Sequence, residues 1–419
     1  MTERLLQFIW QFQYFNKKDL QTTAGEVLQV VSAGLLNRNQ GPDFLDARIR
    51  IGNTLLAGNI ELHLDEADWN RHAHAGDPNY RNIILHVLWE QQPRQPLLSL
   101  PTISLKQRVS KLLLQRYDTL MRGGAFVPCA GSLQDVPLLT WAKWKERLLA
   151  ERLLRKSALA EEYLLQSHQH WEEVFWWMLA RNFGIPINAE PFEAVARSLS
   201  LTILARHKNH LHQLEALLLG QAGLLDKNFH DDYAIMLAKE YRFYKKKYGL
   251  HPVPQQVHFL RMRPGNFPTV RLAQLAMMLH ISGFLFSLVR ESETVKDLYS
   301  LLQVTAGDYW HTHYLLDEPA VFMKKNVGAQ MTENIIINTV VPLLFAYGHV
   351  RNEQQFKDKA LGWMEQLAPE KNAITNGWSG LGIENRHAWD SQALLELKKE
   401  YCDARRCLEC PVGNSILCR

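Results

Sequence analysis

The sequence has no long uninterrupted apolar run and no recognisable leader. Its most apolar stretch, residues 272–289, contains Gln274, His280, Ser282 and Ser287, whereas a membrane-spanning helix needs about 20 mostly apolar residues. The opening residues MTERLLQFIW lack the basic, apolar and small-residue pattern of a secretory signal. These absences predict a cytoplasmic protein that does not cross a membrane.

A strong charge of either sign is also absent. Lys and Arg number 47 against 43 Asp and Glu, a net charge of +4. This excess is too small to indicate nucleic acid by itself, because that argument needs basic residues clustered on one face. The hydrophobic fraction of 47% and the charged fraction of 21% are those of a globular protein, and they exclude a disordered, collagen-like or coiled-coil chain.

The pattern of apolar residues changes along the 419 residues, a length typical of two or three domains. In the first part, residues 46–51 alternate between apolar and polar, Gly52-Asn53 predicts a hairpin turn, and residues 54–64 form the returning strand. Residues 82–89 are apolar enough for a buried strand. From residue 137 onward, apolar residues recur at helical spacing.

These patterns predict an α+β fold. We expect a small N-terminal β-sheet domain with a hairpin and flanking helices over residues 1–136, a large all-helical domain over 137–398, and a short cysteine-rich metal-binding tail over 399–419.

The returning hairpin strand carries a carboxylate and an imidazole on one face. Successive strand side chains point to opposite faces, so Glu61 and His63 share one face, roughly 7 Å apart along the strand. Pro42-Asp43 ends the preceding polar loop, which places Asp43 within reach of the same region. An ordinary half-buried hairpin whose outer face carries Glu and His is the structural alternative.

This arrangement resembles the PD-(D/E)xK nuclease superfamily, in which Pro-Asp precedes one hairpin strand and an acidic-x-Lys triplet lies on the next. The resemblance implies that Asp43 and Glu61 hold Mg²⁺, which prefers oxygen ligands, and that the metal activates water at a phosphate. The third position of the triplet is His63 rather than Lys, so it is not a constant positive charge near pH 7.

A second group of candidate ligands follows the hairpin. His72 and His74, in an H-x-H arrangement, together with Asp77 and with His86 of the next strand, are ligand types that suit Zn²⁺ or Fe²⁺. They predict a metal-dependent hydrolase as an alternative. A polar turn in which the histidines bond to the backbone is the simpler interpretation.

The cysteines are concentrated at the end of the chain. Cys402, Cys407, Cys410 and Cys418 have the spacing C-x4-C-x2-C-x7-C. In a cytoplasmic chain such clustering favours a metal over disulfides, and we predict either an iron–sulfur cluster or zinc held by these four residues. We interpret Cys129, far upstream, as a small buried hydrophobic residue.

Three arginines form a candidate phosphate-binding surface in the helical part. Arg261, Arg263 and Arg271 flank Pro268, which fits the first turn of a helix, and helix N-termini favour anions. Buried ion pairs that lock the loop are an equal alternative for these side chains.

The stretches GPDFLDARI, GNIELHLDEADWNRHAH and NYRNIILHVLWE resemble an uncharacterised bacterial family of unknown function. The resemblance extends over nearly the full chain, including RMRPGNFPTVRLAQLA and the cysteine tail, and it implies no established activity.

Three hypotheses follow for function. The first is a Mg²⁺-dependent phosphodiesterase acting on DNA or RNA, with Asp43, Glu61 and His63 at its centre. The second is a non-catalytic nucleic-acid-binding or scaffold protein with a structural metal in its tail. The third is the hydrolase built on His72, His74, Asp77 and His86. The sequence indicates neither the substrate nor the oligomeric state.

Overall fold

The computed structural model describes residues 1–418 except 38, 72–76, 91–99 and 261. It divides into two compact units. The first comprises Met1–Glu146, Gly380–Gly382 and Leu395–Arg419, and the second comprises Arg147–Ser379 and Ile383–Leu394. The cysteine tail therefore belongs to the same unit as the N-terminal sheet.

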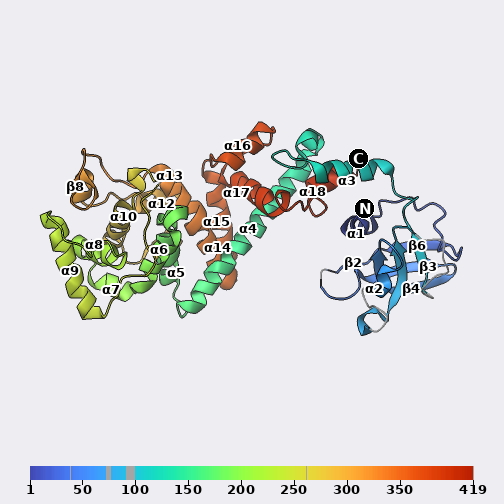
Figure 1. Ribbon diagram of the computed structural model, residues 1–419, viewed down its shortest axis with the longest axis horizontal. Helices are drawn as coiled ribbons and strands as arrows, with labels where there is room; N and C mark the ends of the chain where they lie inside the picture. The colour runs from blue at the N-terminus through green and yellow to red at the C-terminus, as the bar shows by residue number, and fades with distance from the viewer. Residues whose placement is uncertain (38, 72–76, 91–99, 261, 419) are drawn as a thin grey trace. The chain divides into compact units, whose positions relative to one another are not determined.

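The first unit combines a sheet with short helices (Figure 1). Its elements are α1 (Glu3–Gln11), β1 (Leu28–Ser32), β2 (Leu35–Leu36), β3 (Phe44–Ile51), β4 (Thr54–His63), α2 (Asp68–Arg71), η2 (Pro78–Tyr80), β5 (Ile83–Leu88), β6 (Thr102–Ser104), α3 (Lys111–Arg122), η3 (Ala130–Asp135), η7 (Leu397–Cys402) and α18 (Pro411–Leu417). The predicted hairpin and buried strand are confirmed, whereas β2 and β6 were not predicted.

The strands lie in the order β1-β3-β4-β5-β6, and β2 also pairs with β3. The pairs β1/β3 and β3/β4 are antiparallel, and β4/β5 and β5/β6 are parallel. A parallel neighbour requires a crossover connection, which the segment containing α2 provides between β4 and β5. The ends of β4 and β5 therefore lie beside each other and beside the start of β3.

The β3–β4 turn explains why the hairpin register is fixed. Ile51 pairs with Thr54, so Gly52 and Asn53 form a two-residue turn. Gly52 has a φ of 53°, a left-handed conformation that glycine adopts without steric cost. On β3, Ala47, Ile49 and Ile51 are buried while the residues between them are exposed, as the alternating sequence predicts.

The second unit is almost entirely helical. Its elements are α5 (Trp171–Phe183), α6 (Ile185–Ser198), α7 (Leu201–Arg206), α8 (Leu211–Gln221), α9 (Asp232–Tyr248), η4 (Pro264–Asn266), α10 (Pro268–Ile281), α11 (Leu285–Glu291), α12 (Val295–Leu302), η5 (Asp308–Thr312), β7 (His313–Leu315), β8 (Glu318–Pro319), α13 (Ala329–Ile335), η6 (Ile336–Val340), α14 (Val341–Val350) and α15 (Gln354–Gln366). Three further helices, α4 (Leu138–Gln166), α16 (Ala373–Gly380) and α17 (Ala388–Glu396), have residues in both units. The predicted α+β class is confirmed.

One continuous hydrophobic cluster forms the core of the second unit. Trp176 and Phe175 of α5 are almost fully buried in it, with Leu217 of α8. Helices α8 and α9 approach so closely that a Cβ on Gly220 would lie 2.1 Å from the ring of Tyr241, so only glycine fits there.

Among the described residues, no single helix is long and apolar enough to cross a membrane. Helices α10 and α11 pass that test only as a pair, and they meet at an angle of 68°. Most of α10 is buried in the core of the second unit.

Candidate functional site

The strand register brings Asp43 and Glu61 together. Phe44 pairs with Ile60, so extending the register by one residue sets Asp43 opposite Glu61. The backbone N–H of Asp43 donates to Oε2 of Glu61 at 3.1 Å, and the backbone N–H of Leu62 donates to Oδ2 of Asp43 at 2.9 Å. Each carboxylate thus accepts a hydrogen bond from the strand that carries the other, and the two lie side by side as the spacing predicted.

Helix α1 holds the aspartate from its other side. The side-chain amide of Gln7 donates to Oδ1 of Asp43 at 2.7 Å, and α1 packs against β4 and β2. Thr2 caps the helix by accepting a hydrogen bond from the backbone N–H of Leu5, a contact typical of helix starts. The Gln7 contact could not be predicted from local sequence patterns, because it depends on how the helix docks on the sheet.

The histidine of the triplet is buried rather than turned to solvent. Glu61 and His63 share a face as predicted, and His63 Nε2 lies 3.6 Å from Glu61 Oε1. On its other side, His63 Nδ1 shares a hydrogen bond of 2.9 Å with Nε2 of His86. The two histidines are 1% and 0% exposed, so His63 orders the interior of the site and does not face an incoming phosphate.

Aromatic rings close the site around the histidines. Trp69 presents its ring edge-on to His63 and His86, with ring centroids 6.1 and 5.3 Å away, and Tyr80 packs edge-on against Trp69 at 6.1 Å. Burial, followed by the charges of Glu61 and Asp43, raises the pKa of Tyr80 to about 12. The tyrosine therefore stays a neutral hydrogen-bonding group beside the carboxylates.

Glu61 is the most strongly perturbed carboxyl of the site. Burial and, to a smaller extent, the neighbouring carboxylate of Asp43 together raise its pKa to about 9, although the hydrogen bond from the Asp43 backbone acts to lower it. Glu61 is only 4% exposed, whereas Asp43 is partly exposed. Two adjacent carboxyl groups cannot both ionise cheaply in such a place unless a cation neutralises them.

The alternative histidine site is only partly within the described residues. His72 and His74 lie outside them. Asp77 accepts a hydrogen bond from the backbone N–H of Asn79 at 2.9 Å, a local turn contact, and His86 belongs with His63. Among the residues that the structure describes, no three His, Cys, Asp or Glu side chains are arranged to hold a metal ion.

The arginine loop is held by internal contacts. Arg271 is 8% exposed, and its guanidinium donates to the side-chain oxygens of Gln274 and Asn266 at 2.9 and 2.5 Å. Burial lowers the pKa of Arg271 to about 10. Arg263 is exposed at the start of η4, and Arg261 lies outside the described residues. Arg271 therefore locks the loop and is not available to a phosphate on the surface.

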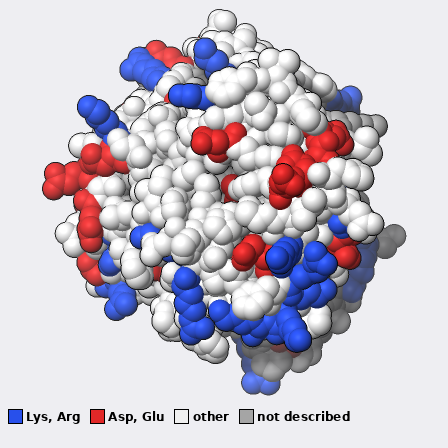
Figure 2. Space-filling model, turned by 90° about the vertical axis from the view of Figure 1, so that its left-hand side faces the viewer, with Lys and Arg blue, Asp and Glu red and all other residues white. Residues whose placement is uncertain are grey.

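Basic side chains are more accessible on α9. Its last turn carries Lys245, Lys246 and Lys247, all exposed, beside exposed Arg242 and Phe243. On the face of the molecule shown in Figure 2, basic side chains gather towards the lower edge, and acidic ones are scattered among broad uncharged areas. This face carries no single continuous basic band.

The structure separates the predicted cysteine ligands. Cys407 and Cys410 are buried, Cys402 is partly buried, and their thiols interact electrostatically with one another and with buried Cys129. Cys418 is exposed, and its thiol donates to Oδ1 of Asn414 at 2.7 Å.

The group around Cys418 is different from that around the other thiols. Tyr14 donates to the same oxygen of Asn414 at 3.0 Å, and the charge that acts on Cys418 is that of Arg116. The electrostatic contacts therefore group Cys402, Cys407 and Cys410 with Cys129, whereas Cys418 lies beside Asn414 and Tyr14. That the four tail cysteines hold one metal stays a prediction.

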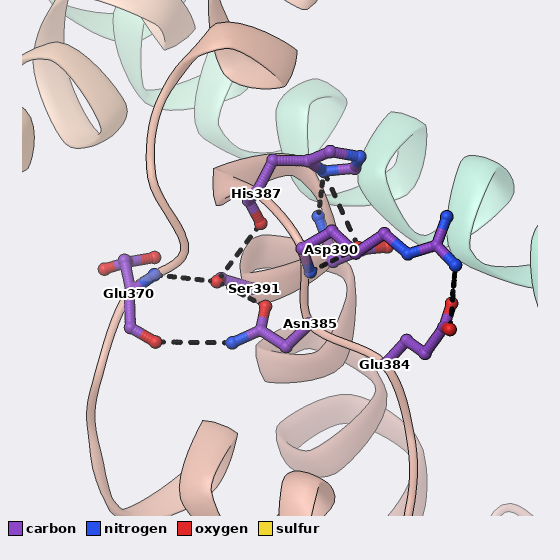
Figure 3. Close-up of polar contacts among 7 residues, drawn as sticks. Glu370, Glu384, Asn385, His387, Asp390 and Ser391 are labelled. Carbon is purple, nitrogen blue, oxygen red and sulfur yellow. Dashed lines mark hydrogen bonds and ion pairs between the residues drawn. The ribbon is translucent and has the colours of Figure 1, made fainter.

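A polar network in the second unit includes a serine, a histidine and an aspartate but has a different role (Figure 3). The hydroxyl of Ser391 donates to Asn385 and accepts from the backbone N–H of Glu370, at 2.7 and 2.9 Å. His387 Nδ1 lies 3.6 Å from Asp390 and does not contact the Ser391 hydroxyl through its ring. These contacts order the start of α17 and do not form a nucleophile with a base.

Comparison with known proteins identifies the family and nothing beyond it. No curated protein and no solved structure matches the chain. A family model described as protein of unknown function, DUF2851, matches residues 3–373, which includes the carboxylate site and Cys129 but ends before the cysteine tail. The chain therefore belongs to the DUF2851 family.

Proposed function

We propose that this protein is a Mg²⁺-dependent phosphodiesterase that hydrolyses nucleic acid, with Asp43 and Glu61 as the metal ligands. The observation that carries the proposal is the pair of adjacent carboxylates at the ends of two neighbouring strands, one partly exposed and one buried with a raised pKa. Such a pair favours a cation that neutralises it.

The donor set suits magnesium. Mg²⁺ is usually bound by one or two carboxylates and completes its coordination with waters and substrate phosphate oxygens, so it does not require a third protein ligand. When bound, it would supply charge stabilisation at a phosphate and a more acidic water. Hydrolysis of a phosphodiester consumes one water and yields an alcohol and a phosphate monoester.

The remaining residues position the two ligands. Gln7 and the N–H of Leu62 fix the orientation of Asp43. His63 lies beside Glu61 and is in turn fixed by His86. In this proposal His63 positions Glu61 and does not replace the lysine of the nuclease triplet in contacting the substrate.

Nuclease assays with matched variants test the proposal. The purified full chain is incubated with labelled single-stranded DNA, double-stranded DNA and RNA, in Mg²⁺, in Mn²⁺ and in EDTA. We expect metal-dependent cleavage that falls at least about 100-fold in Asp43→Asn and Glu61→Gln. Asp46→Asn is the control, because Asp46 is exposed in β3, three residues after Asp43, and has a φ of 55°, which Asn tolerates.

Two results would contradict the proposal. One is the absence of cleavage of all three substrates in both metals, which favours the non-catalytic binding or scaffold alternative. The other is cleavage that survives in both Asp43→Asn and Glu61→Gln, which would assign the activity to another site or to a contaminant.

A further inference from the structure

The chain segment before η3 and the C-terminal segment pack together in the first unit. α18 contacts both α3 and η3, which lie on either side of Cys129 in the chain. The guanidinium of Arg405 donates to the carbonyl oxygens of Met121 and Gly123. Lys398 lies over the ring of Phe126 at 5.2 Å. These contacts bring Cys129 to the segment that carries Cys402, Cys407 and Cys410.

The four cysteines form one buried group. Cys129, Cys407 and Cys410 are 7–8% exposed, Cys402 is partly buried, and none forms a disulfide. Burial raises the pKa of Cys129 to about 12 and that of Cys407 to about 11, and in both the thiol of Cys410 contributes. Cys129 immediately precedes η3 and Cys410 immediately precedes α18, so the contact between α18 and η3 brings these two buried cysteines to the same junction.

The turn from Cys407 to Cys410 has the compact geometry that a metal-binding turn requires. The backbone N–H of Cys410 donates to the carbonyl of Cys407 at 3.4 Å. A Cβ on Gly413 would lie 2.2 Å from that same carbonyl oxygen, so the chain folds back tightly over the turn.

We infer that Cys129, Cys402, Cys407 and Cys410 bind a thiophilic metal as a four-thiolate site, and that Cys418 is not a ligand. Among the described residues, no three His, Cys, Asp or Glu side chains are already arranged to hold a metal ion. Binding therefore draws the four sulfurs towards one another, and it displaces the thiol protons. Four thiolates leave no open position for water, so the site is structural. One zinc ion and an iron–sulfur cluster share this ligand chemistry.

Metal analysis of four proteins tests the assignment. The full chain is purified without air or chelators, its affinity tag is removed, and zinc, iron and acid-labile sulfide are measured in the wild type, Cys129→Ser, Cys410→Ser and Cys418→Ser. We expect about one zinc per chain without colour, or about four irons with sulfide and broad visible absorption. Either content should fall at least about tenfold in Cys129→Ser and Cys410→Ser and stay unchanged in Cys418→Ser.

A second measurement needs no variant and so does not depend on whether the variants fold. The wild type is alkylated, before and after treatment with a strong chelator, and the modified cysteines are identified by mass spectrometry. We expect Cys418 to react at once and the other four to react only after the metal is removed.

Two outcomes overturn the inference. The first is a wild type that contains no metal and binds neither added Zn²⁺ nor Co²⁺ nor a reconstituted cluster. The second is retention of the metal in Cys129→Ser with loss in Cys418→Ser, which would restore the ligand set that the tail spacing alone predicted.

Discussion

The carboxylate site and the thiol group lie in the same compact unit, yet the chain assembles them in opposite ways. Asp43 and Glu61 are 18 residues apart on strands joined by a two-residue turn. Cys129 meets Cys402, Cys407 and Cys410 only after the chain has passed through the whole second unit. Local strand pairing therefore determines the carboxylate site, whereas the thiol group depends on how distant segments dock.

Removal of the metal should have the largest effect on stability, and it should disrupt the thiol group but not the carboxylate site. If the four cysteines hold a metal, a chelator should destabilise the first unit by about 3 kcal/mol or more, lowering its unfolding midpoint by roughly 6–12 °C. Calorimetry of the wild type and Cys418→Ser, with and without chelator, checks this. Cys129→Ser should already lack the metal. If the chelator lowered the stability of this variant as much as that of the wild type, the prediction would be wrong.

A single methyl group at Gly413 should have the next largest effect. In Gly413→Ala the new Cβ collides with the backbone carbonyl of Cys407 at 2.2 Å, so we expect a loss of about 2–3 kcal/mol together with most of the metal. Gly124→Ala is the matched control, because its Cβ would meet nothing within 4 Å. Denaturant unfolding and metal analysis of both variants measure the difference in stability and in metal content. Equal stability and equal metal content in the two variants would contradict the close approach of Gly413 to Cys407.

Neutralising Glu61 should have the opposite effect, because it should stabilise the first unit. The pKa of Glu61 is about 9 in the folded state, against an ordinary value of 4.5. Between these values the unfolded chain releases a proton that the folded state keeps, so stability falls as pH rises from about 4.5 to about 9.

Without divalent metal, the free energy of unfolding of Glu61→Gln should therefore equal that of the wild type near pH 4.5. At higher pH the variant should become increasingly more stable than the wild type, by up to about 3 kcal/mol near pH 7. Urea unfolding across this range measures the difference. Added Mg²⁺ should reduce the stability difference, because it stabilises only the wild type. A stability difference that does not change with pH would contradict the raised pKa of Glu61.

Removal of the Gln7 contact should have the smallest effect. In Gln7→Ala, Asp43 loses the 2.7 Å hydrogen bond to its Oδ1 but keeps the one from Leu62. We expect about 1 kcal/mol weaker Mg²⁺ binding, or roughly fivefold, with little change in fold. Calorimetric titration with Mg²⁺ tests this, with Gln13→Ala as control, since the side-chain amide of Gln13 donates to the carbonyl of Trp10 at the end of the same helix.

Most of the hairpin could be predicted from the sequence, because strand alternation and a Gly-Asn turn are local signals. The shared face of Glu61 and His63 and the proximity of Asp43 follow from that geometry. The burial of His63 against His86 could not be predicted, because it needs the parallel pairing of β4 with β5. Local patterns also could not place Cys129 near the tail, since the docking of α18 on η3, which directly follows Cys129, joins two segments far apart in the sequence.

The division of the first unit between the two ends of the sequence has a consequence during synthesis. About 250 residues separate Glu146 from Leu395, and ribosomes add roughly 5–20 residues per second. The sheet and its carboxylates therefore leave the ribosome roughly 12–50 s before the segment that completes their unit. During that interval the surface that later receives α18 is uncovered, and a nascent chain stalled there should be the form most open to chaperones and proteases.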